Sequence, residues 1–243
     1  MAKNILVAGF EPFGGDKVSP SEMVARGFEG RVVAGRSVVA RVLPVETRTL
    51  RERMETVLRE ADADIVIGLG QLGVRTALSI ERVAINVLDF EHADNVGVMR
   101  KGDSIARGGP EARLSNLPFD RIIAALHENA IPSSISNSAG TFVGNQLLYE
   151  TIALTEHAIP PVVAGFVHLP YLPAQAVAAG SASTPSMSLE LMRKGIELVL
   201  EAVVPWMDQR PAAPSAIAAG AAGGAADKKR QMWIPRGVKE VER

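Results

Sequence analysis

The sequence predicts an α/β fold built around a largely parallel sheet. Over the first ~205 residues, short β-rich apolar runs alternate with amphipathic helical patterns, an order typical of parallel strands joined by helices. The composition, with 47% hydrophobic and 22% charged residues, is that of an ordinary globular protein rather than of a disordered or fibrous one. A chain of 243 residues also buries enough apolar surface to form a core without disulfide bonds or a structural metal.

Net charge and residue usage exclude several classes of protein. The 26 basic and 27 acidic residues leave a net charge of -1, whereas a dedicated nucleic-acid binder carries a strongly basic face. There is no cysteine, which excludes a disulfide scaffold, a thiolate metal site and a cysteine nucleophile. The apolar residues 5–10 meet Glu11 too early for a secretory signal, and no apolar run approaches the ~18 residues of a membrane span. We therefore expect a cytoplasmic protein that binds neither nucleic acid nor membrane.

Capping and periodicity predict two helices in the first half of the chain. Residues 19–22 (SPSE) have the form of a capping box with proline at the first helical position, so a helix is expected to run to about residue 27. Apolar residues at helical spacing predict a second helix within residues 46–60. The strands expected in this half are residues 4–9, 38–45, 65–70 and 77–88.

A long irregular connection divides the second half. Residues 91–117 are rich in Gly, Asp and Arg, and so long a connection is uncommon in a compact domain unless it forms part of a site or an interface. Beyond it, helices are expected at 119–128 and 143–156, strands at 132–136 and 162–168, and a last helix with an apolar stripe from Leu189 to Val203.

The chain changes character after Trp206, which predicts a domain over residues 1–206 and an appendage over 207–243. Residues 211–226 are a low-complexity Ala/Gly/Pro stretch with almost nothing to anchor in a core, so they are interpreted as a mobile linker. Residues 228–236 pair basic charge with a tryptophan. This basic tail either docks on a neighbouring subunit or an acidic partner, or remains solvated.

One of the four histidines stands out by position. His127 and His157 fall near expected helix ends, where a surface role is expected. His168 ends an apolar run, so it projects from the carboxyl end of a buried strand, where open α/β sheets place their sites. Glu81 is a carboxylate within another apolar strand and needs a partner there, for which His168 and Arg82 are candidates. The residues alone leave both a structural and a functional interpretation of His168 open.

The turn after the first strand carries two aromatic residues. Residues 10–15 (FEPFGG) place Phe10 and Phe13 beside a Gly-rich turn, where they either clamp a flat ring or simply belong to the core. The spacing is not that of a phosphate-binding loop. This pattern alone leaves the function open.

A series of motifs in one order then resembles a known family. Together they are similar to pyroglutamyl-peptidase I, also called pyrrolidone-carboxylate peptidase, over about residues 3–203. The motifs are residues 9–15 (GFEPFGG), 68–71 (GLGQ), 79–86 (SIERVAIN), 136–143 (SNSAGTFV), 145–149 (NQLLY), 165–173 (GFVHLPYLP) and 185–190 (PSMSLE).

The resemblance implies a fold, an activity and a set of site residues. It implies a single three-layer α/β/α domain with a mostly parallel, twisted open sheet, commonly assembled as a homotetramer. The family consists of cytosolic cysteine omega-peptidases that remove an N-terminal pyroglutamyl residue, so a pyroglutamyl peptide or pyroglutamate is the expected partner and no cofactor or metal is expected. Its histidine and the glutamate that orients it match His168 and Glu81. The positions around the pyroglutamyl ring match Phe10, Phe13, Gln71, Phe142 and Val143.

Three departures from the family pattern concern the chemistry. Where the family reads Ala-Gly-Thr-Tyr-Val-Cys-Asn, residues 139–145 read AGTFVGN, so the nucleophile position is Gly144. The arginine that helps to stabilise the oxyanion in the family matches Glu91, which reverses the charge. The asparagine usual after the aromatic loop matches Ser19. Three departures favour natural loss or change of the peptidase activity over an engineered knockout, which would alter the nucleophile alone.

These departures leave three hypotheses. In the first, the protein has lost the cysteine mechanism and acts as a non-catalytic pyroglutamyl-binding or structural homologue. In the second, it is a slow hydrolase that uses water activated by His168 and Glu81. In the third, Glu81, Glu91, His92 and His168 hold a divalent metal, although their spacing matches no recognised metal motif.

Overall fold

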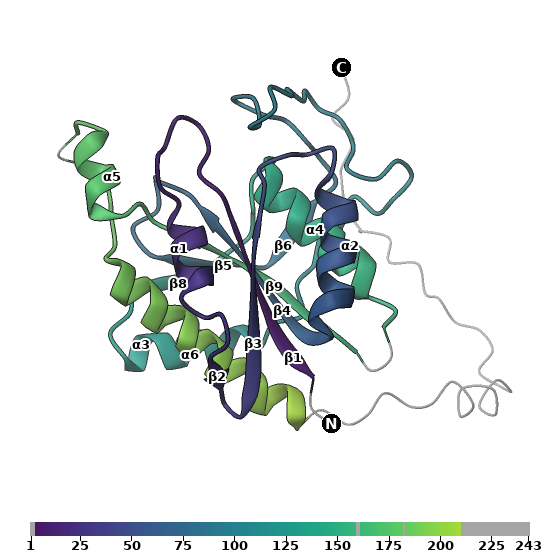
Figure 1. Cartoon of the computed structure of the whole chain (residues 1–243), viewed down its shortest axis with the longest axis vertical. Coiled ribbons are helices and arrows are strands. Elements are labelled where there is room, and N and C mark those ends of the chain that lie inside the picture. The colour runs from purple at the N-terminus through teal and green to yellow at the C-terminus, as the bar shows by residue number, and fades with distance from the viewer. Residues whose placement is uncertain (1–2, 159–160, 182, 210–243) are drawn as a thin grey trace, which may run out of the picture. The chain divides into compact units, whose positions relative to one another are not determined.

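A seven-stranded sheet lies between two layers of helices (Figure 1). The computed structural model describes residues 3–158, 161–181 and 183–209. The strands are β1 (Asn4–Phe10), β2 (Val32–Val33), β3 (Arg36–Leu43), β4 (Ala63–Gln71), β5 (Leu78–Glu81), β6 (Val83–Ile85), β7 (Ala112–Leu114), β8 (Ser133–Ser136) and β9 (Val163–Leu169). The helices are α1 (Pro20–Arg26), α2 (Leu50–Ala61), α3 (Phe119–Glu128), α4 (Val143–Thr155), α5 (Pro173–Ala178) and α6 (Leu189–Asp208).

The sheet is mostly parallel, as the sequence predicts. Its strand order is β2-β3-β1-β4-β9-β5-β8, and the neighbours β3-β1, β1-β4, β4-β9 and β5-β8 run parallel. Strand β5 runs antiparallel to β9, and β2 antiparallel to β3. Strands β6 and β7 form a separate antiparallel pair. The carboxyl ends of β1, β4 and β9 therefore meet at one edge of the sheet.

Two apolar clusters fill the two faces of the sheet. Along β1, Ile5 and Val7 pack with α1, α3 and α6, whereas Leu6 and Ala8 pack with α2 and α4. This alternation follows from the period of two in a strand. Figure 1 shows α1, α3 and α6 on one side of the sheet and α2 and α4 on the other. The three-layer α/β/α architecture is therefore confirmed.

The main correction concerns residues 77–88, which were expected to form one long strand. The chain instead changes partners at Arg82, an exposed residue between β5 and β6. The Arg82 N–H donates to the carbonyl of Ser136 at 2.8 Å, and its carbonyl accepts from the N–H of Ser115 at 2.9 Å. Apolar alternation continues across this point, so the pattern alone does not reveal that the ladder ends.

The other differences lie at the ends of elements. Ser19 caps α1 by accepting from the Glu22 N–H, which is one half of the predicted capping box, whereas the Glu22 carboxylate pairs with Arg26 at 2.8 Å. The second helix begins at Leu50 rather than near residue 46, and α6 continues past Pro205 to Asp208. The short elements β2, β7 and α5 were not predicted.

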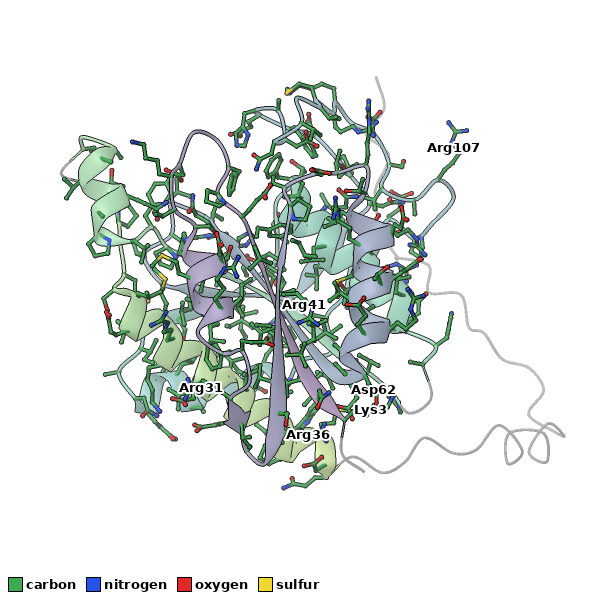
Figure 2. All side chains as sticks on the ribbon, viewed as in Figure 1. Lys3, Arg31, Arg36, Arg41, Asp62 and Arg107 are labelled. Atoms are coloured by element: carbon green, nitrogen blue, oxygen red, sulfur yellow. The ribbon has the colours of Figure 1, made fainter. Side chains whose placement is uncertain are left out.

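Ion pairs fasten the amino-terminal end of the sheet. The buried Arg36 guanidinium pairs with Asp64 at the start of β4 and with Asp208 at the end of α6. Nearby, Lys3 pairs with Asp62 at 3.0 Å. Figure 2 shows Lys3, Arg36 and Asp62 at the bottom of the view, while the loop after β1 rises to the opposite end in Figure 1.

The expectations for the appendage fall mostly outside the described residues. The linker at 211–226 and the basic tail at 228–236 lie wholly beyond residue 209. Among the helices that the structure describes, none is long and apolar enough to cross a membrane.

Candidate functional site

A pocket of about 250 Å³ opens at the carboxyl ends of β1 and β4, against the amino terminus of α4. Open α/β sheets characteristically bind ligands at this edge. The pocket contains each residue predicted to surround a pyroglutamyl ring. Its lining consists of Phe10, Phe13, Gly70, Gln71, Leu72, Asp89, Glu91, His92, Ala139, Gly140, Thr141, Phe142, Val143, Gly144 and His168.

His168 and Glu81 form a buried pair behind the pocket. The Nδ1 atom of His168 lies 2.8 Å from Oε1 of Glu81, and the Glu81 side chain is 0% exposed. Side chains alternate between the two faces of a strand. The neighbours of Glu81 and His168 along their strands pack under α3 and α6, so these two side chains point to the opposite face, toward α4. The predicted proximity of these two residues is confirmed. Where Glu81 is a carboxylate, which only accepts, Nδ1 is the donor of this hydrogen bond and Nε2 is the nitrogen on the side of Gly144.

The free nitrogen of His168 is directed at Gly144. A Cβ atom built on Gly144 would lie 3.3 Å from His168 Nε2 and 3.1 Å from Cζ of Phe166. Gly144 is the second residue of the 13-residue helix α4, where the first backbone N–H groups have no partner within the helix. A side chain at position 144 would therefore lie beside an imidazole and within the positive end of a helix dipole.

Phe166 explains the glycines at the end of β4. Its ring occupies the space where side chains of Gly68 and Gly70 would stand, since a Cβ on either residue would come within 2.7 Å of that ring. The ring centroids of Phe166 and His168 are 4.9 Å apart at 68°. The two glycines therefore leave room for the Phe166 ring, which packs against the His168 imidazole.

Aromatic rings form the opposite wall. Phe13 and Phe142 lie 5.6 Å apart between centroids, and Phe90 packs edge-on against Phe142 at 4.6 Å. His92 contacts both of these rings, with centroid distances of 5.8 Å to Phe13 and 4.8 Å to Phe142. His92, expected from the sequence only as a possible metal ligand, is therefore part of the pocket wall.

A tight turn presents Phe13. The Asp16 N–H donates to the Phe13 carbonyl at 3.1 Å, and the two central residues, Gly14 and Gly15, have φ of 64° and 90°. Positive φ at both central positions is the requirement of a type I′ turn, which glycine meets without strain. The Gly-Gly pair therefore fixes the aromatic residue at the pocket and Asp16 on the other side of the turn.

The Gln71 side chain holds this turn rather than being free in the pocket. Its amide donates to Asp16 Oδ2 at 2.7 Å, and its oxygen accepts from Gln175 at 2.9 Å. Gln175 also donates to Asp16 at 3.0 Å. Gln71 lines the pocket, but its amide links the turn to the start of α5.

The charged residues at the mouth are acidic. Asp89 and Glu91 line the pocket, and no lysine or arginine of the described part of the chain does. Asp89 pairs with Lys101 at 3.4 Å on the outer side. Over the described residues, no group of three His, Asp or Glu side chains could hold a metal ion. The geometry therefore gives no support to a divalent site at Glu81, Glu91, His92 and His168.

Comparison with known proteins identifies the family. A profile described as pyroglutamyl peptidase (Peptidase_C15) matches residues 3–205. The chain is 38% identical over 205 residues to the pyrrolidone-carboxylate peptidase of Coprothermobacter proteolyticus, covering 84% of this chain and 99% of that protein. It is 38% identical over 203 residues to the enzyme of that name from Pyrococcus furiosus, covering 81% and 98%. This chain belongs to the pyroglutamyl peptidase family.

Solved structures of the family share the fold. The pyrrolidone carboxyl peptidase of Thermococcus litoralis superposes with a TM-score of 0.81 at 35% identity, covering 85% of this chain and 95% of that one. A mutant of the Pyrococcus furiosus enzyme gives a TM-score of 0.81 at 37% identity, covering 84% and 99%. This pyroglutamyl peptidase homologue contains no cysteine in its sequence.

Two polar residues that support the site were missed by the sequence analysis. Asn145, next to Gly144, is 0% exposed. Its side-chain oxygen accepts from the Ile85 N–H at 2.9 Å, and its amide nitrogen donates to the carbonyls of Ile85 at 2.9 Å and Val87 at 3.2 Å. Glu11 accepts from the Val45 N–H at 3.2 Å and from the Asn95 amide at 2.8 Å. Both residues fall within the motifs, but nothing local in the sequence indicates partners so distant along the chain.

A buried carboxyl lies further along α4. Burial raises the pKa of Glu150 from 4.5 to about 7, although a hydrogen bond from Gln146 lowers it in part. The Gln146 amide also accepts from the Thr47 hydroxyl at 2.7 Å, which ties α4 to the segment before α2. The helix that presents Gly144 therefore carries a group that titrates near neutral pH.

Proposed function

We propose that this homologue binds pyroglutamyl groups without the cysteine mechanism of the family. The observation that carries the proposal is the aromatic pocket beside Gly144, where His168 and Glu81 are paired but the facing residue has no side chain. In this proposal, Phe10, Phe13, Phe142 and Val143 enclose the ring. The backbone at Gln71 and at the start of α4 supplies hydrogen bonds to it.

Binding by such a pocket follows from its shape and polarity. Small-molecule sites bury a ligand among apolar and aromatic side chains, and a few polar groups fix its orientation. Phe13 and Phe142 provide flat surfaces on the loop side, and the free N–H groups of α4 face an anionic or carbonyl oxygen. Pyroglutamate has only about nine heavy atoms, so ordinary ligand efficiency gives roughly millimolar affinity.

Loss of covalent catalysis follows from the residues present. Acyl transfer needs a nucleophilic side chain, and neither Gly144 nor any cysteine elsewhere in the sequence provides one. Glu91 lines the pocket with a negative charge, which opposes the oxyanion that forms during attack on a carbonyl. In this proposal, His168 and Glu81 are retained as a structural pair that shapes the pocket.

Two parallel measurements test this proposal. Pure protein is incubated with a chromogenic pyroglutamyl amide, and its thermal unfolding is recorded with increasing pyroglutamate. We expect no release of chromophore above the rate in buffer, together with a saturable rise in Tm. Turnover that His168→Ala abolishes would contradict the loss of catalysis, and an unchanged Tm at several millimolar pyroglutamate would contradict binding.

The domain boundary and the assembly belong to the same proposal. By family resemblance, residues 1–206 form the binding domain, residues 207–243 form an appendage, and the protein assembles as a homotetramer. Light scattering coupled to gel filtration measures the assembly directly, and a monomer would contradict it.

A further inference from the structure

A second cavity adjoins the ring-sized pocket. It measures about 710 Å³, and four residues (Phe13, Gln71, Leu72 and His92) line both spaces. The two cavities therefore meet across the Phe13 and His92 rings. A ligand that extends past this shared boundary from the first cavity enters the second.

The second cavity carries a carboxylate in a fixed position. Asp16 lines it, and its Oδ2 atom accepts from both Gln71, at 2.7 Å, and Gln175, at 3.0 Å. These donors are neutral amides, so they orient the carboxylate without cancelling its charge. Within the part of the chain that the structure describes, Asp16 forms no ion pair. The turn at Gly14 and Gly15 keeps it beside the cavity.

The rest of the lining suits a long side chain with a positive end. Among the described residues, Asp16, Asp89 and Glu91 line the two cavities, whereas no lysine or arginine does. Val74, 78% exposed, offers an apolar surface to a methylene chain at the rim. Burial and the negative charge of Asp16 both raise the pKa of the Tyr171 hydroxyl, so that charge is felt across the cavity.

We propose that the second cavity is a subsite for the residue that follows the pyroglutamyl ring, and that Asp16 makes it select a basic residue. The inference rests on the proposed function, because the ring must occupy the first cavity for the next residue to enter the second. A lysine or arginine there places its methylenes along Val74 and its cation near Asp16.

Matched ligands test the subsite by calorimetry on the full chain. The three ligands are pyroglutamyl-lysine amide, its Nε-acetyl-lysine counterpart and pyroglutamyl amide, which carries the ring alone. The lysine compound is expected to bind about fivefold more tightly than the acetylated one, the upper range for an ion pair still open to water. Salt should shrink this preference, because screening weakens partly exposed charges.

Two isosteric variants locate the charge. Asp16→Asn keeps an acceptor for Gln71 and Gln175 but removes the charge, so the ratio of the two affinities should fall to about one. Asp62→Asn is the control, because Asp62 pairs with Lys3 at the opposite end of the sheet (Figure 2). Its φ of 44° is a conformation that asparagine tolerates. This variant should leave the ratio unchanged.

The outcomes separate the subsite from the proposed function. Equal binding of the two peptides by the unaltered protein, with the ring compound also bound, overturns the subsite alone. A preference that persists in Asp16→Asn overturns the role of Asp16. Absence of binding by all three compounds overturns the proposed function and the subsite with it. The ratio in the unaltered protein and its salt dependence decide the question even if Asp16→Asn does not fold.

Discussion

A side chain at position 144 would contact the His168 imidazole and the Phe166 ring. His168 Nε2 and the Phe166 ring both lie within 3.3 Å of a Cβ built there, and the Glu81 carboxylate holds the histidine from behind. A small side chain can enter if the Phe166 ring yields by a few tenths of an ångström. A side chain at this position would therefore face the His168 imidazole, whereas Gly144 itself has none.

Introducing a cysteine at position 144 should produce little peptidase activity. Gly144→Cys alone is expected to hydrolyse a chromogenic pyroglutamyl amide slowly, because the Glu91 charge still opposes the oxyanion. Adding Glu91→Arg should raise the rate by about 10²-fold or more, the typical effect of one oxyanion donor. Steady-state kinetics of the two variants measure this. Gly144→Ser with Glu91→Arg is the control, because an alcohol is a far weaker nucleophile than a thiolate.

Equal rates for the single and double cysteine variants would show that Glu91 does not act on the reacting carbonyl. A fast single variant would show that the pocket needs no further donor. Either result would contradict the interpretation of Glu91 given above.

At the residue scale, sequence reasoning reached the groups that stand at strand ends and within family motifs. His168 ends an apolar run, and Glu81 is a lone carboxylate on an alternating strand, so both could be predicted. Asn145 and Glu11 could not be assigned roles, because their partners at Ile85 and Asn95 are about 60 to 84 positions away. The contact of the exposed His92 ring with Phe142 likewise depends on a loop whose path has no periodic signal.

At the scale of elements, α4 joins the pocket to the rest of the fold. Its first turn presents Gly144, Asn145 bonds the strand β6, and Gln146 bonds Thr47. Glu150 lies one turn further on and has a pKa of about 7. Changes along this helix should therefore be measurable as changes in stability.

Glu150 should make stability depend on pH. Its pKa is about 7 in the folded protein and 4.5 ordinarily, so between these values the folded state keeps a proton that the unfolded state has lost. The free energy of unfolding should fall as pH rises through this window. Glu150→Gln removes the effect, so it should stabilise the protein by on the order of 2–3 kcal/mol at pH 8 and by about nothing near pH 4.5.

Urea unfolding at the two pH values measures this difference. The exposed Glu201 on α6 provides the control, since Glu201→Gln should shift both curves equally and by little. If Glu150→Gln raised the free energy of unfolding equally at both pH values, the pKa of Glu150 would not be raised by burial.

Asn145 should contribute more to the free energy of unfolding than an average buried polar residue. Asn145→Ala leaves the Ile85 N–H and two carbonyls without partners, so a loss of about 2–4 kcal/mol in the free energy of unfolding is expected. Asn137→Ala is the control, because Asn137 is exposed and accepts only from Arg82, and it should change stability by about 0.5 kcal/mol or less. Similar losses for the two variants would show that Asn145 does not hold β6 to α4.

Most elements were predictable because their patterns are local. The capping box at Ser19 and the apolar stripe of α6 each identify one element without reference to another. The break at Arg82 was not predictable, because it depends on where β8 and β7 end, at Ser136 and just before Ser115. Likewise, α6 extends to Asp208 where Arg36 pairs with its last turn, a contact between distant segments.

At the scale of the whole molecule, α6 is where the family match ends and where, among the described residues, the last members of the apolar cluster shared with α1 and α3 lie. The family profile stops at residue 205, and the partly buried Trp206 and Met207 still pack on the core. A chain ending at Gln209 should therefore unfold within about 2 °C of the full chain, because its free energy changes by less than about 1 kcal/mol.

A chain ending at Val204 should behave differently. It loses Trp206, and it leaves the buried Arg36 with Asp64 alone, so its Tm should be lower by roughly 4–8 °C. Scanning calorimetry compares the three chains. A fall in Tm already in the chain ending at Gln209 would show that residues 210–243 stabilise the domain.

Binding of a pyroglutamyl group without turnover can be tested by NMR, which follows binding and hydrolysis in one sample. Pyroglutamyl-alanine amide at a few millimolar is mixed with the full chain, and the ligand spectrum is followed for a day beside an equal sample of Phe13→Ala. We expect saturation transfer from the protein to the ring protons, weaker transfer with Phe13→Ala, and no signals of free pyroglutamate. The appearance of pyroglutamate at a rate above that in buffer, or the absence of any transfer, would contradict the account.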